Sequence, residues 1–124
     1  MNNTIYIYTD GACKGNPGPG GWGTLLIYEG IKKELYGFEP ETTNNIMELT
    51  AVIESLKSIK RKHPIIITTD STYVKDGITD WIESWKTNNW RTANKKPVKN
   101  KELWVELDSL CALYDIAWEW VRGH

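Results

Sequence analysis

A short segment rich in glycine and proline follows a strand-like run near the N-terminus. Residues 4–9 read Thr-Ile-Tyr-Ile-Tyr-Thr, a series of β-branched and aromatic residues typical of a β-strand. Asp10 and Gly11 come next, and residues 15–21 are mostly glycine and proline, so we expect regular structure to stop there. A carboxylate at the end of a strand, beside backbone that can approach a ligand closely, is a common way to build a binding site in α/β folds. Taken alone, Asp10-Gly11 fits a simple turn equally well, because Asp-Gly is a common turn dipeptide.

Length and composition predict one globular domain. The 124 residues are 40% apolar and 25% charged, and the formal net charge of −1 means that any electrostatic argument must rest on local patches. Cys13 and Cys111 form no spacing typical of a zinc site or a disulfide framework, which fits a reducing compartment. The sequence contains no apolar run of ~20 residues and no signal-like leader. We therefore expect a cytoplasmic protein without a membrane span.

The apolar patterns predict strands and helices in an order typical of a mixed sheet. The expected strands are residues 4–9, 21–28, 32–38, 65–69 and 116–121, and the expected helices are residues 46–59, 71–78 and 102–114. The first three strands have short connections and should pair antiparallel, with a hairpin at Glu29-Gly30. Pro40 and residues 42–45 should end the third strand and supply the helix N-cap. A right-handed crossover then places strand 65–69 parallel to the first strand.

Glu48 lies in the expected first turn of helix 46–59. By itself it would be an ordinary helix-stabilising acid, because negative charge near a helix N-terminus favours the dipole. In the parallel arrangement, however, Asp10 and Asp70 end adjacent strands at one edge of the sheet, and the helix with Glu48 packs across that edge. Three converging carboxylates repel one another unless a cation lies between them. Hard oxygen ligands suit Mg²⁺ or Mn²⁺, and paired ions of this kind catalyse in-line displacement at phosphorus.

A basic segment without any acidic residue lies between residues 86 and 101. Its cations are Lys86, Arg91, Lys95, Lys96, Lys99 and Lys101, and the tryptophans that precede or interleave them are Trp81, Trp85 and Trp90. On a nearly neutral chain such a segment favours a phosphate-binding surface. The alternative is an ordinary solvated surface whose tryptophans pack in the core.

Six blocks of this sequence resemble type 1 ribonuclease H of the bacterial kind. They are residues 8–21, 42–49, 69–71, 81–86, 94–100 and 118–124, and they follow the order and spacing of that family. The resemblance implies a ribonuclease H-like α/β fold: a five-stranded mixed sheet in the order 3-2-1-4-5, strand 2 antiparallel, with helices on both faces. That family hydrolyses the RNA strand of RNA–DNA hybrids with divalent metal held by clustered carboxylates, and leaves 5′-phosphate ends.

The resemblance also implies roles for individual residues. Asp10, Glu48 and Asp70 are expected to hold Mg²⁺, for which Mn²⁺ can substitute, with two ions bound beside the substrate and Gly11 next to the metal. His124 is expected to assist turnover or product release. The residues expected to contact the hybrid are Cys13, Asn16, Thr43, Asn44, Asn45, Thr72, Trp81, Trp85, Lys86, Trp90, Lys95, Lys96 and Lys99. The basic segment resembles the protrusion with which the family grips the DNA strand, and Thr72 stands where bacterial relatives usually carry a longer amide.

In the family, a further helix with a fourth carboxylate follows the position of His124. We therefore expect residues 1–124 to form a single ribonuclease H domain, truncated at its C-terminus, with one sheet face partly uncovered. We expect a monomer, as in the family, with self-association through that face as the alternative. Two other functions stay open: a non-catalytic domain that binds RNA–DNA hybrids, and another phosphoryl-transfer enzyme of this fold, such as an integrase or transposase core. The pair Asn44-Asn45 and the basic segment argue against the integrase or transposase core.

Overall fold

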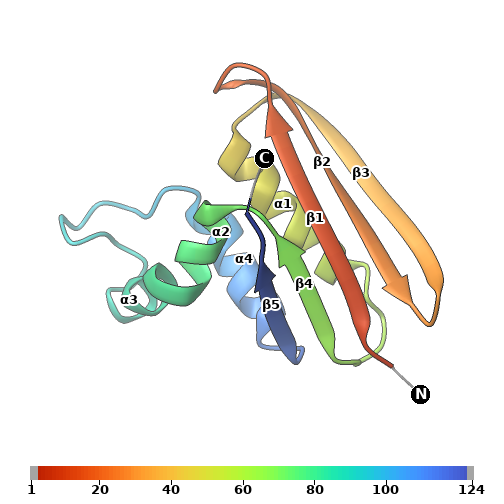
Figure 1. Cartoon of the computed structure of the whole chain (residues 1–124). Helices are drawn as coiled ribbons and strands as arrows, with labels where there is room; N and C mark the ends of the chain where they lie inside the picture. The colour runs from red at the N-terminus through yellow and green to blue at the C-terminus, as the bar shows by residue number, and fades with distance from the viewer. Residues whose placement is uncertain (1–2, 123–124) are drawn as a thin grey trace.

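The computed structural model describes residues 3–122 as a twisted mixed sheet with helices packed against it (Figure 1). Its strands are β1 (Ile5–Cys13), β2 (Gly18–Tyr28), β3 (Ile31–Thr42), β4 (Ile65–Thr69) and β5 (Ile116–Trp120). Its helices are α1 (Asn44–Lys57), α2 (Thr72–Asp76), α3 (Ile82–Thr87) and α4 (Lys101–Cys111), and a π-helical turn, η1 (Gly77–Trp81), joins α2 to α3. Within residues 3–122, no helix is both long and apolar enough to cross a lipid bilayer.

The strand order confirms the predicted topology. Among the described residues, the sheet has five strands in the order β3-β2-β1-β4-β5. β2 is antiparallel to β1 and to β3, whereas β1, β4 and β5 run parallel. The two parallel connections contain α1 and the α2–α4 region, respectively, as right-handed crossovers require. This topology brings the carboxyl ends of β1, β4 and β5 to one edge of the sheet, where Figure 1 shows the arrowheads of β4 and β5 close together.

The first hairpin is longer than predicted. Asp10 lies inside β1, opposite Gly23, rather than at the strand's end, and β2 already begins at Gly18. The glycine-rich segment can pair because it lies against other backbone: a Cβ on Gly20 would come within 2.7 Å of the Ala12 carbonyl oxygen. β3 likewise runs through Pro40, which is tolerated there because β3 is an edge strand. Glycine and proline content predicted that the strands end at these residues. The backbone pairing that the fold provides outweighs that local preference.

The core lies between the sheet and α1. Buried side chains of β1, β2 and β4 face one side of the sheet, where Ile7 pairs with Leu26 and Ile67. The predicted helical stripe is confirmed at its centre, where Leu49, Ile53 and Leu56 are buried, whereas Ile46 and Ile59 are only partly buried. α1 ends at Lys57, so Ile59 lies beyond the helix. The side chain of Thr43 caps α1 by accepting a hydrogen bond from Ile46 N at 3.2 Å, as the 42–45 segment predicted.

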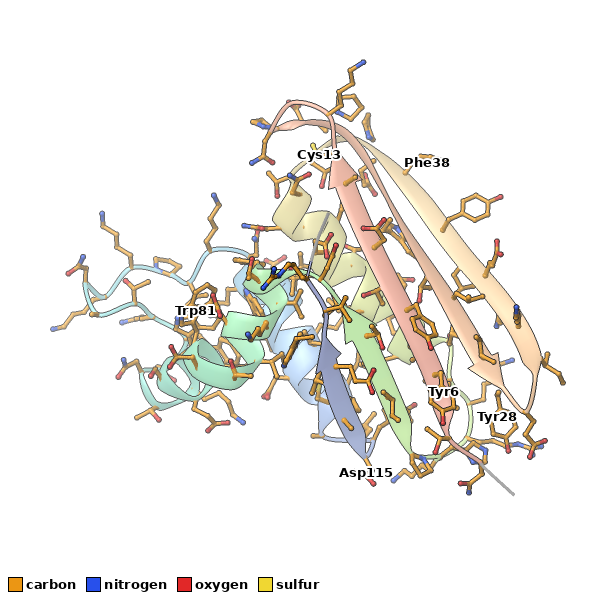
Figure 2. The ribbon with its side chains drawn as sticks, in the orientation of Figure 1. Tyr6, Cys13, Tyr28, Phe38, Trp81 and Asp115 are labelled. Atoms are coloured by element: carbon orange, nitrogen blue, oxygen red, sulfur yellow. The ribbon has the colours of Figure 1, made fainter. Side chains whose placement is uncertain are left out.

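The opposite face of the sheet carries large aromatic side chains in contact with solvent. Tyr8, Tyr36 and Phe38 are 44%, 73% and 79% exposed. Register places all three on the face that α1 does not cover, because Asp10 pairs with Gly23 and Gly23 with Tyr36. Figure 2 labels Phe38 on β3. In the part of the chain that the structure describes, this face is partly uncovered, as predicted.

Gly77 lies directly against the ring of Trp104, a residue of α4. Trp104 is fully buried, and its indole Nε1 donates a hydrogen bond to the Tyr73 hydroxyl at 3.0 Å, which fixes the ring. A Cβ on Gly77 would overlap Cη2 of that ring. The π-helical turn therefore begins at a residue that must lack a side chain.

Gly77→Ala should destabilise the protein, although alanine in a helix is ordinarily favoured over glycine by about 1 kcal/mol. Because Trp104 cannot move aside, we expect a net loss of about 1–3 kcal/mol, the usual cost of overpacking a core. Chemical denaturation measures the difference. Gly23→Ala is the control, since its Cβ would come no closer than 3.9 Å to Leu35 O and should cost little. A Gly77→Ala variant as stable as the unmutated chain would contradict this packing.

Candidate active site

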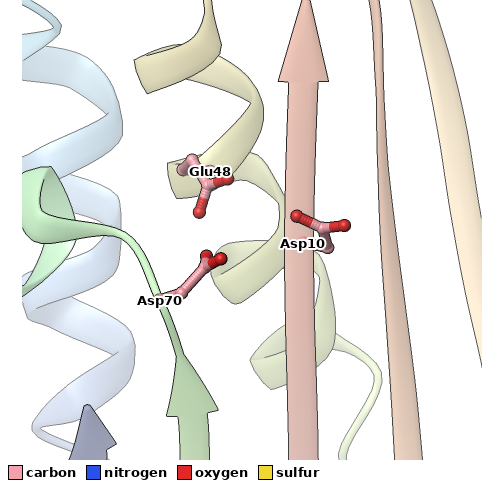
Figure 3. A group of neighbouring side chains, drawn as sticks. All are labelled: Asp10, Glu48 and Asp70. Carbon is pink, nitrogen blue, oxygen red and sulfur yellow. The ribbon is translucent and has the colours of Figure 1, made fainter. Parts of the chain in front are cut away.

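Three carboxylates converge at the edge where β4 ends (Figure 3). Asp10 comes from β1, Glu48 from α1 and Asp70 from the residue after β4. One oxygen from each lies within 4.8 Å of the others, in the only such acidic group found among residues 3–122. The register explains the convergence, because Tyr8 pairs with Thr68 in the parallel ladder and Asp10 and Asp70 both follow two residues later. The predicted grouping of these three side chains is confirmed.

Glu48 lies in the second turn of α1, not in the first as predicted. α1 begins at Asn44, two residues before the expected start, and its first turn contains no acid. The helix dipole therefore does not account for Glu48. Instead, the backbone N–H of Gly11 donates a hydrogen bond to Glu48 Oε1 at 3.0 Å. A Cβ on Gly11 would lie 2.6 Å from the Met47 carbonyl carbon, so only glycine permits this close approach.

The environment of Glu48 disfavours its charge. Burial raises its pKa from 4.5 to about 7; the Gly11 hydrogen bond opposes this rise, and the nearby Asp70 and Asp10 carboxylates add to it. Its second oxygen, Oε2, is buried and has no hydrogen-bond partner among the described residues. Such an atom ordinarily has a partner, because an unsatisfied buried acceptor is costly. A cation beside Oε2 would supply one.

These residues fit a divalent cation with oxygen ligands. Mg²⁺ binds oxygens at about 2.1 Å, so two ligands on opposite sides of one ion lie about 4 Å apart. The carboxylate oxygens, within 4.8 Å of one another, would need only a small contraction around one ion. The three side chains leave further positions open for water and substrate, as Mg²⁺ sites that act on phosphates do.

A polar pocket of about 420 Å³ adjoins the carboxylates. It is lined by Gly11, Ala12, Cys13, Asn44, Asn45, Glu48, Asp70, Ser71, Thr72 and Tyr73. The structure thus brings four of the residues predicted to bind substrate next to the acidic group. Asn16 supports the rim, because its Oδ1 accepts a hydrogen bond from Asn44 N at 3.1 Å. Thr43 contributes as the N-cap of the same helix.

Ser71 and Tyr73 line this pocket but were not singled out from the sequence. Ser71 could have been found, because a serine after a strand and before a helical run is a typical N-cap, and its hydroxyl accepts from Val74 N at 3.1 Å. Tyr73 carried no such signal, since an aromatic residue at a helical spacing usually indicates core packing.

The predicted tryptophans form a separate aromatic cluster. Trp81, Trp85 and Trp90 are half-buried, and successive ring centroids lie 5.7 and 6.4 Å apart. Trp81 also packs on Tyr73, a lining residue of the pocket, at 5.8 Å. Figure 2 shows Trp81 beside α2 and α3, well apart from Cys13 at the far end of β1. Core packing, the alternative kept open above, therefore accounts for part of their surface.

The basic segment is exposed and projects away from the sheet, as the blue-green loop of Figure 1 shows. Lys95, Lys96 and Lys99 are exposed, and buried Val98 anchors the loop by a hydrogen bond from its N to Trp90 O. Lys86 differs, because its Nζ lies 3.9 Å from Glu83 and 3.4 Å from Asp108. Its charge is therefore partly balanced within the chain. His124 lies outside the described residues.

Glu48→Gln should change how stability depends on pH. The folded chain keeps the Glu48 proton up to about pH 7, whereas the unfolded chain loses it near 4.5. Between these values Glu48 binds more protons in the folded than in the unfolded state, so its contribution to stability falls as pH rises through this window. In Glu48→Gln this fall should be absent. Relative to the unmutated chain, the variant should therefore be more stable above pH 7 than it is at pH 4.5. Melting temperatures measured in EDTA across pH 4.5 to 7.5 check the difference.

Glu34→Gln is the matched control for that measurement, because it removes the same charge from an exposed position of β3 that takes part in no ion pair among residues 3–122. Its pH dependence should follow that of the unmutated chain. If Glu48→Gln also follows it, the buried carboxylate does not carry the cost assigned to it here.

Comparisons with known proteins agree with this geometry. The family model described as RNase H matches residues 2–124. Ribonuclease HI of Neisseria meningitidis serogroup B is 61% identical over 124 residues, which are all of this chain and 86% of that protein. Ribonuclease H of Pseudomonas entomophila is 56% identical over 124 residues, 84% of its length.

Solved structures share the fold. The crystal structure of LC9-RNase H1, described as a type 1 RNase H with the type 2 active-site motif, has a TM-score of 0.87 and 33% identity, covering all of this chain and 65% of that one. LC11-RNase H1, solved in complex with an RNA/DNA hybrid, has a TM-score of 0.69 at 22% identity, covers 95% of this chain and 85% of that one, and supports the fold alone. The family match along nearly the whole sequence and the relatives of high identity lead to one conclusion: this chain belongs to the RNase H family.

Proposed function

We propose that this chain is an endonuclease that hydrolyses the RNA strand of RNA–DNA hybrids. The observation that carries the proposal is the convergence of Asp10, Glu48 and Asp70 around a buried, unpartnered carboxylate oxygen. The relatives named ribonuclease HI, 61% identical along the whole chain, support the same activity. Acids held together at a cost to stability are typical of a site that serves catalysis rather than folding.

The cofactor in this proposal is Mg²⁺, for which Mn²⁺ can substitute, with two ions when substrate is bound. Bound at the carboxylates, the cation would stabilise charge that develops on the phosphate during cleavage. The chain's own part is to hold the ligands: Gly11 N–H fixes Glu48, and the β1–β4 register fixes Asp10 beside Asp70. Cleavage is proposed to leave a 5′-phosphate end.

The polar pocket would distinguish RNA from DNA. A protein recognises RNA at a given position through the 2′-hydroxyl, which both donates and accepts hydrogen bonds. Asn44, Asn45 and Thr72 line the pocket with short side chains that include both hydrogen-bond donors and acceptors. Cys13 lines the same pocket. We propose that these residues contact the RNA strand, with Asn16 and Thr43 holding the start of α1 in place.

The DNA strand would lie along the exposed basic segment. Lys95, Lys96 and Lys99 are exposed and take part in no ion pair among residues 3–122, so their positive charge would be available to the DNA phosphates. We propose that the exposed faces of Trp81, Trp85 and Trp90 border the same strand. We propose that Lys86 contributes less to binding of the DNA strand, because Glu83 and Asp108 partly balance its charge.

Three further points belong to this proposal. His124 is proposed to assist turnover or product release. The chain is proposed to act in the cytoplasm as a monomer, with self-association through the exposed Tyr36 and Phe38 face as the alternative that the chain's oligomeric state in solution decides. A non-catalytic hybrid-binding domain remains the second candidate, and the following assay separates the two.

The chain should cleave the RNA strand of a hybrid in the presence of Mg²⁺ or Mn²⁺ and leave matched RNA–RNA and DNA–DNA duplexes intact. Asp70→Asn should reduce cleavage at least 100-fold, because a neutral amide is a poor ligand for a hard dication and each ~1.4 kcal/mol of lost stabilisation is tenfold in rate. Single-turnover cleavage of end-labelled hybrid measures both.

Melting curves with and without millimolar Mg²⁺ provide the control for that loss of activity. The unmutated chain should gain stability from the ion, since a ligand of the native state stabilises it, and Asp70→Asn should gain less. Hybrid that is bound but never cleaved would favour the non-catalytic candidate. An equal response to Mg²⁺ in both proteins would remove Asp70 from the ligand set.

A further inference from the structure

A second pocket lies on the other side of Asp70, where the ends of β4 and β5 lie next to each other. Its volume is about 290 Å³. It is lined by Thr69, Asp70, Ser71, Thr72, Lys75, Trp120, Val121 and Arg122. Because Asp70, Ser71 and Thr72 also line the pocket that contains Glu48, the two form one continuous surface that passes over Asp70. We call the part on the β5 side the Lys75–Arg122 pocket.

Two cations and one acid line this pocket. Lys75 and Arg122 are both exposed, and Asp70 is the single carboxylate among the lining residues. In the part of the chain that the structure describes, ion pairs are formed by Lys57 and Lys86, and neither Lys75 nor Arg122 takes part in one. Their charges are therefore available to a ligand, unlike that of Lys86.

The backbone fixes both residues beside Asp70. Lys75 belongs to the first turn after the Ser71 N-cap, and its N–H donates to Ser71 O at 3.0 Å. On the other side, Val121 N donates to Thr69 O at 3.1 Å, which extends the pairing of β5 with β4 by one residue. Arg122 follows directly. The pocket is thus built from two ordered elements that flank the end of β4.

The chemistry of this surface suits a phosphate group. A nucleic acid strand whose scissile phosphate lies at the three carboxylates must continue past Asp70 on one side or the other. Those carboxylates repel the rest of the polyanion, and cations next to them offset that repulsion. Lysine and arginine contacts to phosphate position a strand without reading its sequence.

We propose that Lys75 and Arg122 bind a phosphate of the RNA strand that neighbours the cleaved linkage. This inference rests on the function proposed above and adds two positioning residues to it. They hold the RNA strand in register over the carboxylates. Lys95, Lys96 and Lys99 bind the DNA strand, further away from the carboxylates. Ser71 and Thr72 also line this pocket, and their hydroxyls add polar groups to it.

The test compares variants that each remove two positive charges, all in an Asp10→Asn background in which hybrid is bound but not cut. Lys75→Gln/Arg122→Gln alters the pocket. Lys60→Gln/Arg61→Gln is the matched control, between α1 and β4 at the end of the sheet away from the carboxylates. Fluorescence anisotropy over a range of salt concentrations measures hybrid binding. Each lost phosphate contact lowers the slope of log K against log salt by about 0.9.

The pocket variant should lose about 0.9 of slope, because it gives up its contact with one phosphate, and the control should lose clearly less. An unchanged slope, or an equal change in the control, overturns the proposal. If the unmutated chain fails to cleave hybrid in the assay above, the proposed function fails whatever these slopes are. If it cleaves and the slope is unchanged, only the present inference fails.

A second measurement assigns the strand. The hybrid carries a short window of ribonucleotides flanked by DNA, which fixes its register, and one linkage at a time is replaced by an uncharged methylphosphonate. Neutralising the RNA linkage next to the cleaved one should weaken hybrid binding by the Asp10→Asn protein. It should leave binding by the pocket variant unchanged, because the pocket substitutions have already removed the same contact. The assignment to RNA is contradicted if each neutralised linkage lowers hybrid affinity equally in both proteins. It is also contradicted if the two proteins differ only at linkages of the DNA strand.

Discussion

The hydrogen bond from Gly11 N to Glu48 Oε1 joins the central strand to the long helix at the one place where both approach the end of β4. It depends on a glycine whose missing side chain lets β1 touch the backbone of Met47. It also depends on the hydrophobic core beneath, where Leu49, Val52 and Ile53 hold α1 against the sheet. With strand and helix fixed in this way, Glu48 has little freedom to turn away from Asp10 and Asp70. The acidic group is therefore positioned by regular secondary structure rather than by loops, which favours precise geometry.

This arrangement is unfavourable in the absence of a cation. Burial and two neighbouring carboxylates raise the pKa of Glu48 to about 7, and its Oε2 has no partner among the described residues. The core on the α1 face of the sheet is mainly apolar, and among residues 3–122 the other buried side-chain oxygens without a partner are the uncharged hydroxyls of Thr9 and Thr42. Local departures from ordinary stability rules of this kind are typical of functional sites. The same logic extends to the neighbouring surface, where Lys75 and Arg122 have no ion-pair partner in residues 3–122.

Hydrophobic period and chain order predicted the parallel crossover and the convergence of the three carboxylates, and the resemblance to ribonuclease H implied the strand order. It failed where pairing partners decide the structure. The glycine-rich segment extends β1 and β2 because its backbone pairs with other backbone, and Pro40 stays in β3 because it lies on an edge strand. The position of Glu48 in the helix was one turn off, since capping by Thr43 starts α1 earlier than the apolar stripe does. Ion pairs between distant segments, such as Lys86 with Asp108, carry no local signal at all.

We propose above all that Asp10, Glu48 and Asp70 share one divalent cation. A crystal of the protein grown with Mn²⁺, whose anomalous scattering locates the ion directly, tests it without any assay of activity. We expect an anomalous peak within coordination distance of one oxygen from each of the three side chains, with Glu48 Oε2 as the oxygen that gains a partner. A peak whose ligands exclude Glu48, or an ordered carboxylate group with no peak at saturating Mn²⁺, would contradict it.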